Sequence, residues 1–140
     1  YGFSSGDEVL LAAARIITSV LRESGRENIF VGHAGGDDFL FICPIAEIKT
    51  ICEEILSRFD VVIRDFYNEE DLDQGGIVSK ARRGEIRKFP VITVSIAVVL
   101  NEKKRYRHYG QASQDAKEIM GYVKGLKGST YMIDRRGGYR

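Results

Sequence analysis

The sequence has little cysteine and no excess of charge of either sign, and each shortage excludes a class of protein. Two cysteines, Cys43 and Cys52, are too few for a disulfide framework, and their spacing matches no metal-ligand motif. We therefore predict two small buried thiols in a reducing compartment. Lys and Arg number 21 and Asp and Glu 20, so the formal net charge is +1. This balance provides no overall field that would recruit nucleic acid or an anionic membrane, and we expect neither as a partner.

Long apolar runs are also lacking. None approaches the roughly 20 residues that a membrane-spanning helix needs, and no signal peptide is recognised. The chain instead has a globular composition, with 44% hydrophobic and 29% charged residues among 140. We predict a single domain over residues 1–134 and a flexible tail over residues 135–140. Because the sequence starts without Met, directly in a helix-start signal, we expect it to be part of a longer cytoplasmic protein.

Hydrophobic periodicity predicts three helices. The first begins near Ser4, in a segment of capping and acidic side chains, and ends at Gly25. The second begins at Pro44 and runs to about Phe66, and the third lies around residues 112–123.

Short apolar runs predict strands between these helices. Two pairs of runs flank glycine-containing turns, as antiparallel hairpins do, and a later run is apolar enough to be buried on both faces. The predicted strands cover residues 28–31, 39–43, 77–80, 85–89, 91–100 and 131–133. Helices interleaved with antiparallel pairs indicate an α+β fold, with helices packed on a mostly antiparallel sheet.

The Gly-Gly-Asp-Asp motif of residues 35–38 lies at the tip of the first predicted hairpin and is the most informative stretch. Gly35 and Gly36 lack a Cβ, so an anionic ligand can approach the backbone closely. Asp37 and Asp38 supply the hard oxygen ligands that Mg²⁺ shares with substrate phosphates. Alone, such a motif is more often only a turn, and in an ideal strand the two aspartates would point to opposite faces.

Several motifs in order resemble the GGDEF family of diguanylate cyclases. These motifs are YGF at residues 1–3, GDEVL at 6–10, HAGGDDF at 33–39, TVSIA at 93–97 and YVK at 122–124. The likeness extends over nearly the whole chain. It implies the ferredoxin-like fold of the nucleotidyl-cyclase palm.

This resemblance also implies a reaction. Members of the family condense two GTP into cyclic di-GMP with Mg²⁺, or alternatively Mn²⁺, and two domains must face each other, so a homodimer is needed for catalysis. The matching positions assign catalysis and metal binding to Asp37 and Asp38, and GTP binding to Asp7, Leu10, Gly35, Gly36, Lys124 and Lys127. Simpler explanations exist for three of them, because Asp7 suits any helix start, Leu10 suits a core, and Lys124 suits a solvated surface.

The chain departs from the family pattern at four points. The family's opening strand, which carries a further metal-binding Asp, would lie before residue 1. Asp38 stands where the family has Glu, and misplacing a carboxylate by about an ångström can cost on the order of 10²-fold in rate. The family's product-inhibition site corresponds to Arg26 and Ile29, and isoleucine cannot act as the required Asp, so we expect no feedback site. His33 replaces an Arg and is interpreted as structural or as a substitute cation.

Two functions of different classes follow from these observations. The first is a diguanylate cyclase domain within an intact parent protein, with no turnover expected of the present chain. The second is an inactive GGDEF domain that acts as a GTP-binding or dimerising regulatory module for a neighbouring signalling domain of a bacterial protein. A third interpretation is an unrelated α+β domain with a chance Gly-Gly-Asp-Asp turn.

Overall fold

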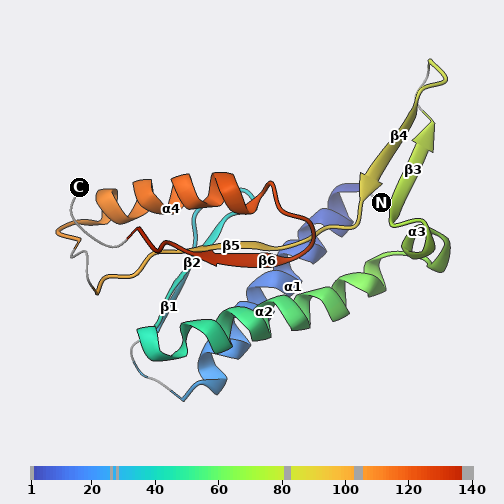
Figure 1. Cartoon of the computed structure of the whole chain (residues 1–140). Coiled ribbons are helices and arrows are strands. Elements are labelled where there is room, and N and C mark those ends of the chain that lie inside the picture. The colour runs from blue at the N-terminus through green and yellow to red at the C-terminus, as the bar shows by residue number, and fades with distance from the viewer. Residues whose placement is uncertain (1, 26, 28, 81–82, 103–105, 137–140) are drawn as a thin grey trace.

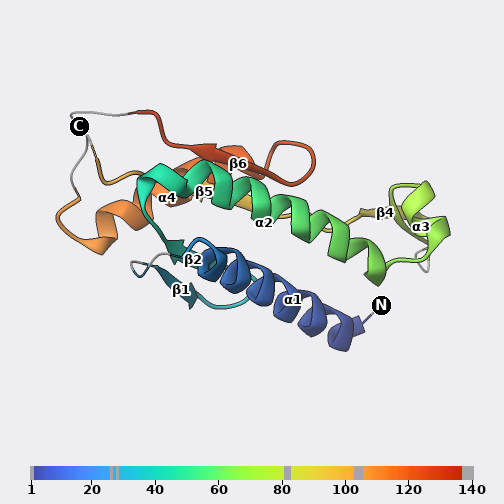
Figure 2. The ribbon, with the colours of Figure 1, turned by 90° about the horizontal axis from the view of Figure 1, so that it is seen from below.

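The computed structural model describes the whole chain except residues 1, 26, 28, 81–82, 103–105 and 137–140. Its two longest helices, α1 (Gly2–Glu23) and α2 (Ile48–Ile63), pack against each other (Figures 1 and 2). Apolar residues three or four positions apart meet in this contact because they fall on one side of each helix. The buried ones are Ile16, Ile17, Val20 and Leu21 in α1 and Ile48, Ile51, Cys52, Ile55, Phe59 and Ile63 in α2.

The two ends of α1 confirm one prediction and correct another. At the C-terminus the Gly25 N–H donates to the Arg22 carbonyl at 3.1 Å, and Gly25 has a φ of +70°, as expected for a helix-ending glycine. The N-terminus lies at Gly2, so residues 4–8, expected to cap the helix, lie inside it. Glycine costs a helix interior only about 1 kcal/mol relative to alanine, and serine less, so the packing of the following turns can offset them.

Strands β1 (Phe30–His33) and β2 (Phe39–Ile42) form the predicted antiparallel hairpin, with His33 opposite Phe39. The chain then enters a 3₁₀ turn, Ile45–Glu47, directly after Pro44, and continues into α2. A second 3₁₀ turn, Arg64–Phe66, ends the helical segment at the residue that the periodicity predicted.

The polar segment between residues 67 and 90 contains the second predicted hairpin, in which β3 (Gly76–Lys80) pairs antiparallel with β4 (Ile86–Pro90). It also contains a helix that the periodicity did not predict, α3 (Glu69–Asp73). Asn68 caps this helix, because its Oδ1 accepts a hydrogen bond from the Asp71 N–H at 2.8 Å. A five-residue helix is too short to show an apolar period, so the cap is its main sequence signal.

Strand β5 (Ser95–Val98), helix α4 (Tyr109–Val123) and strand β6 (Thr130–Ile133) form a βαβ unit in which the strands are parallel and α4 packs on both. Only residues 95–98 of the predicted strand 91–100 are in a strand. Ile96 and Val98 are buried whereas Ser95 and Ala97 are half-buried, so full burial is confined to one face of β5.

The described strands form three separate two-stranded sheets, of which two are antiparallel. The chain is therefore α+β, as predicted, but the described residues do not form one continuous sheet. Residues of β1–β2 and of β5–β6 nevertheless pack into the same core as α1 and α2. These residues are Val31, Phe39, Phe41, Ile96, Val98, Tyr131 and Ile133. Among the described residues, no helix combines the length and the apolar character needed to cross a membrane.

Residues 135 and 136 are the described part of the predicted tail. The Arg136 guanidinium bonds to the Asp134 carboxylate at 2.9 Å and to the Glu118 carboxylate at 2.6 Å. This contact holds the pKa of Asp134 below its ordinary value, because the hydrogen bonds from Arg136, and then its positive charge, favour the ionised carboxylate. The chain is therefore tied to α4 as far as residue 136.

The core contact between α1 and α2 predicts the effect of truncating Leu21, which is fully buried. Leu21→Ala should lower the free energy of unfolding by about 2–5 kcal/mol, through lost burial and the cavity left behind. Leu11→Ala in the same helix removes a side chain that is 51% exposed and should cost less than about 1 kcal/mol. Denaturant unfolding of the two variants measures the difference, and equal losses would contradict this core assignment.

Candidate functional site

Residues 34–38 form the loop at the tip of the β1–β2 hairpin. The Ala34 N–H donates to the Asp38 carbonyl at 2.8 Å, and the Asp38 N–H donates to the Gly35 carbonyl at 3.1 Å, which closes a β-turn over residues 35–38. Gly36 has a φ of +57°, whereas no described residue other than glycine has a positive φ. The φ angle is thus positive at Gly36 and negative at Asp37, the two central residues of the turn. These signs are those of a type II′ turn, a hairpin turn that favours glycine at its first central position.

The turn presents bare backbone to solvent. A methyl group at Gly35 or Gly36 would meet no atom within 4 Å, and residues 34–38 are all exposed. The backbone N–H groups of Gly35, Gly36 and Asp37 donate no hydrogen bond to any described residue. Successive free N–H groups in a turn of this kind form a concavity that can bind an anion. The geometry therefore fits a phosphate group placed over the glycines.

His33, the last residue of β1, supports the turn from the strand side. Its Nε2 lies 2.8 Å from the Gly36 carbonyl oxygen and is the donor, since a carbonyl oxygen only accepts. Its ring stacks on that of Phe39, with ring centroids 5.0 Å apart. The structural role expected for His33 is thus confirmed.

Asp37 and Asp38 are both exposed, and neither carboxylate bonds to another side chain in the described part of the chain. No set of three or more His, Cys, Asp or Glu side chains among the described residues is arranged to hold a metal ion. Mg²⁺ commonly uses one or two protein carboxylates together with substrate phosphates. The two aspartates therefore fit a cation shared with a phosphate ligand better than a cation held by the protein alone.

The other predicted GTP ligands lie on α1 and after α4. Asp7 is exposed and Leu10 half-buried in the N-terminal half of α1, while Lys124 is the C-cap of α4 and Lys127 follows it, both exposed. No hydrogen bond or ion pair between described residues joins any of these four side chains to the turn. Their contact with a shared nucleotide stays a prediction. Because α1 begins at Gly2, helix capping no longer explains the carboxylate of Asp7.

The predicted inhibitory site has no acidic partner at position 29. Arg26 lies outside the described residues, whereas Ile29 is half-buried and packs against the hydrophobic core. Position 29 therefore contributes apolar packing rather than a hydrogen-bond acceptor. Absence of product inhibition stays a prediction for a cyclic dinucleotide assay.

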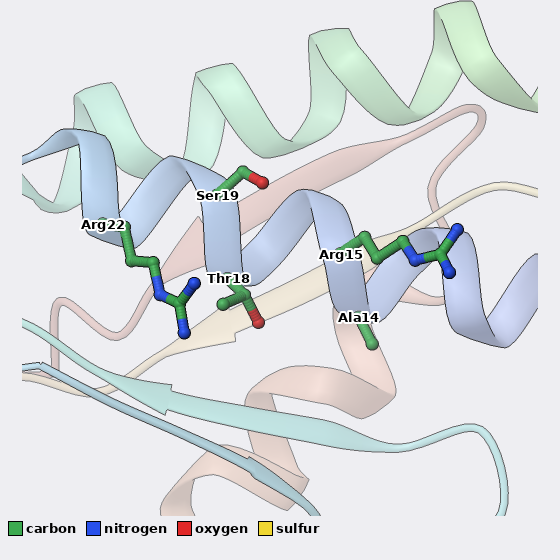
Figure 3. Close-up of a pocket in the computed structure, with 5 residues that line it drawn as sticks. All are labelled: Ala14, Arg15, Thr18, Ser19 and Arg22. Carbon is green, nitrogen blue, oxygen red and sulfur yellow. The ribbon is translucent and has the colours of Figure 1, made fainter.

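Two exposed arginines of α1 have no role in the predicted site, but they share one surface feature of the structure. Arg15 and Arg22 lie two helical turns apart and border a hollow of about 250 Å³ on the surface of α1. Figure 3 shows them at the two ends of this hollow, with Thr18 between them. Ala14 and Ser19 complete the lining. The sequence signal was a polar stripe with a spacing of three and four residues, which also describes an ordinary solvated helix face.

Neither cysteine belongs to a site. Cys52 is fully buried in the α2 core and Cys43 is half-buried, and both are free thiols. Burial raises the pKa of Cys52 to about 12, since a thiolate is poorly solvated in the core. The prediction of a buried thiol is confirmed for Cys52, whereas Cys43 is only half-buried, at the margin of the core.

Comparison with protein-family models, with curated proteins and with solved structures finds no match for the chain. The likeness to the GGDEF family therefore depends on the sequence motifs, and the candidate site depends on the geometry of the turn.

Substitution by alanine should change the stability of the protein in opposite directions at Gly36 and at Gly6. Gly36→Ala places a Cβ at a φ of +57°, which should destabilise the protein by about 1–2 kcal/mol although the surrounding space is open. Gly6→Ala lies within α1, also in open space, and should stabilise it by about 0.5–1 kcal/mol. Denaturant unfolding gives both values. Stabilisation by Gly36→Ala would contradict the described turn.

Because its thiol is buried, Cys52 should react slowly with thiol reagents in the folded protein. In a Cys43→Ser variant, Cys52 is the single thiol and should resist a disulfide reagent at pH 8, because a thiol with a pKa of about 12 is protonated there. Reactivity should appear on addition of denaturant. Because the pKa of Cys52 is higher in the folded than in the unfolded chain, its contribution to the free energy of unfolding is fully present below the ordinary thiol pKa. That contribution is lost as the pH rises toward 12, where the unfolded chain ionises first. Rapid labelling of the folded protein at pH 8 would contradict this account.

Proposed function

We propose that the chain is a GGDEF-type diguanylate cyclase domain and that its Gly-Gly-Asp-Asp turn receives the magnesium-bound triphosphate of GTP. The observation that carries this proposal is the juxtaposition at residues 35–38. Three backbone N–H groups without acceptors in the described chain lie beside two exposed carboxylates without side-chain partners. The N–H groups suit phosphate oxygens, and the carboxylates suit a cation that the phosphates also bind.

The backbone N–H groups and the carboxylates of the turn would act on a bound triphosphate in opposite ways. Without a cation, the charges of Asp37 and Asp38 would repel a triphosphate and oppose the attraction of the N–H groups. When bound, Mg²⁺ supplies the positive charge that makes the carboxylates and the phosphates compatible neighbours. GTP binding at this turn is therefore expected to require a divalent cation.

In the proposed reaction, two domains face each other with one GTP in each. The 3′-hydroxyl of one nucleotide attacks the α-phosphate of the other, a P–O bond forms and pyrophosphate leaves. The protein contributes mainly position and charge, as in other transfers at phosphorus. Gly35 and Gly36 would hold phosphates, Asp7 and Leu10 would orient the guanine, and the remaining predicted ligands, Lys124 and Lys127, would approach the phosphates.

The proposed fold is the ferredoxin-like palm of the nucleotidyl cyclases. It is supported by the common core in which β1–β2 and β5–β6 pack on α1 and α2 while remaining separate two-stranded sheets. The family resemblance implies a central strand ahead of residue 1, and such a strand would join the two pairs into one mostly antiparallel sheet. It would also add the further metal-binding Asp.

A non-catalytic regulatory domain is the second candidate. One observation favours it, namely that the described residues offer only the two turn carboxylates and no third metal-binding side chain grouped with them. The side chain of Asp38, which is shorter than the Glu of the family pattern, also favours a domain without catalytic activity. Such a domain would bind GTP, or dimerise, and control a neighbouring signalling domain.

Nucleotide binding tests the turn directly. Calorimetric titration of the chain with GTP should show binding with Mg²⁺ and none with a chelator, because the cation reconciles phosphate with carboxylate. Asp37→Asn should weaken the Mg²⁺-dependent affinity at least about tenfold, a change of about 1.4 kcal/mol. Asp65→Asn makes the same change at an exposed aspartate on another element and should have no effect.

Turnover then separates the two candidates. A chain extended by the preceding residues should convert GTP with Mg²⁺ into cyclic di-GMP and pyrophosphate if the cyclase proposal is correct. GTP binding without product would favour the regulatory domain. Absence of binding at millimolar nucleotide in both the chain and its extended form would refute the nucleotide role of the turn.

A further inference from the structure

Strands β3 and β4, which we call the arm together with the residues that join them (76–90), form a two-stranded ribbon separate from the other sheets of the described chain. β3 and β4 pair only with each other among the described strands, and the arm extends away from the helices in Figure 1. Its root is held by two hydrogen bonds. The Val91 N–H donates to the Gly75 carbonyl at 3.4 Å, and the Ile92 N–H donates to the side-chain hydroxyl of Tyr67 at 3.1 Å. A two-stranded ribbon alone is only marginally stable in water, so a third strand would stabilise the arm.

β4 is the open edge of the arm. All five of its residues are exposed, whereas β3 begins at the buried Gly76 and contacts α3. In the part of the chain that the structure describes, the backbone groups of residues 86–90 bond only across the pairing with β3. An edge strand directs every second residue's N–H and C=O groups outward, where an extended segment can pair with them.

Apolar side chains are exposed on both faces of this edge. Ile86 is 71% exposed and Phe89 is 52% exposed. They lie three residues apart, and because successive strand residues alternate between faces, they point to opposite sides. A flat surface such as a bilayer would cover one of them, whereas an added strand with its own side chains would cover both.

The arm also concentrates positive charge. Its sequence holds five Lys or Arg residues and one Glu in a chain of net charge +1, so the rest of the chain is net negative. Arg87 and Lys88 are adjacent in β4 and therefore lie on opposite faces. Glu85 approaches Arg87 at 3.9 Å, but an exposed ion pair of this kind contributes little. Pairing with a second copy of β4 is disfavoured, because it would bring these cations together.

We infer that the outer edge of β4 is a docking site for an extended acidic segment of another protein. Its backbone would add a third strand to the arm, its Asp and Glu side chains would pair with Arg87 and Lys88 on the two faces, and its apolar side chains would cover Ile86 and Phe89. Duplex nucleic acid offers anionic groups, but it has neither strand-pairing groups nor apolar side chains for these positions. This inference is independent of the nucleotide role of residues 35–38.

A labelled nine-residue peptide of alternating Glu and Val is a suitable probe, with fluorescence anisotropy as the readout. The wild-type chain should bind it, and the affinity should fall as salt rises because the contacts are exposed charges. Arg87→Glu combined with Lys88→Glu should weaken binding at least about tenfold, as repulsion replaces attraction. Arg15→Glu combined with Arg22→Glu makes the same net charge change on exposed residues of α1 and should bind as the wild type does.

Backbone pairing is tested with the same peptide N-methylated at every residue, which cannot donate to β4 and should not bind. Circular dichroism checks that both charge variants fold, and the milder pair Arg87→Gln and Lys88→Gln should give an intermediate loss. Equal binding by the Arg87 and Lys88 variant, or equal binding of the N-methylated peptide, would overturn the inference. Tighter binding of a 12-base-pair duplex or of phosphatidylserine vesicles than of the peptide, lost in the same variant, would also overturn it.

Discussion

The hydrophobic core is organised around the packing of α1 against α2. Each sheet in the described part of the chain has two strands, and a two-stranded sheet gains too little burial to be stable alone. No pairing between described residues joins β1–β2 to β5–β6, yet both place apolar residues in the core that the two helices form. The helices therefore position the hairpin, and the hairpin positions its tip.

In the turn at residues 35–38, different backbone groups maintain the conformation and remain available to a ligand. Its closure uses the N–H groups of Ala34 and Asp38, and the His33 ring bonds to the Gly36 carbonyl. The N–H groups between these anchors stay open, next to the two carboxylates. An exposed loop held by a packed scaffold is a common place for binding residues, because the loop can vary without disturbing the core.

Net charge describes this chain poorly, because its charges are separated in space. A formal charge of +1 hides a strongly basic arm on a body that is net negative. The arm also exposes the apolar side chains of Ile86 and Phe89 beside an open strand edge, and one added strand would cover both features. Charge, edge and apolar surface coincide in β4, a strand of five consecutive residues that pairs with β3 in a local hairpin.

The sequence was sufficient to predict α1, α2, α4, the two hairpins and the glycine turn, because each shows a local signal: the apolar period of α2, the helix-ending Gly25, or the freedom of Gly36 to adopt a positive φ. It did not predict α3, which is too short to show an apolar period. Contacts in the folded chain were needed to show that residues 95–98 are the strand within a longer apolar run, that β5 and β6 are parallel, and that the described strands remain in three pairs. Such contacts also pack Ile29 into the core. These features depend on contacts between residues distant in the chain, and a local pattern carries no information on which distant partner a strand or a side chain will meet.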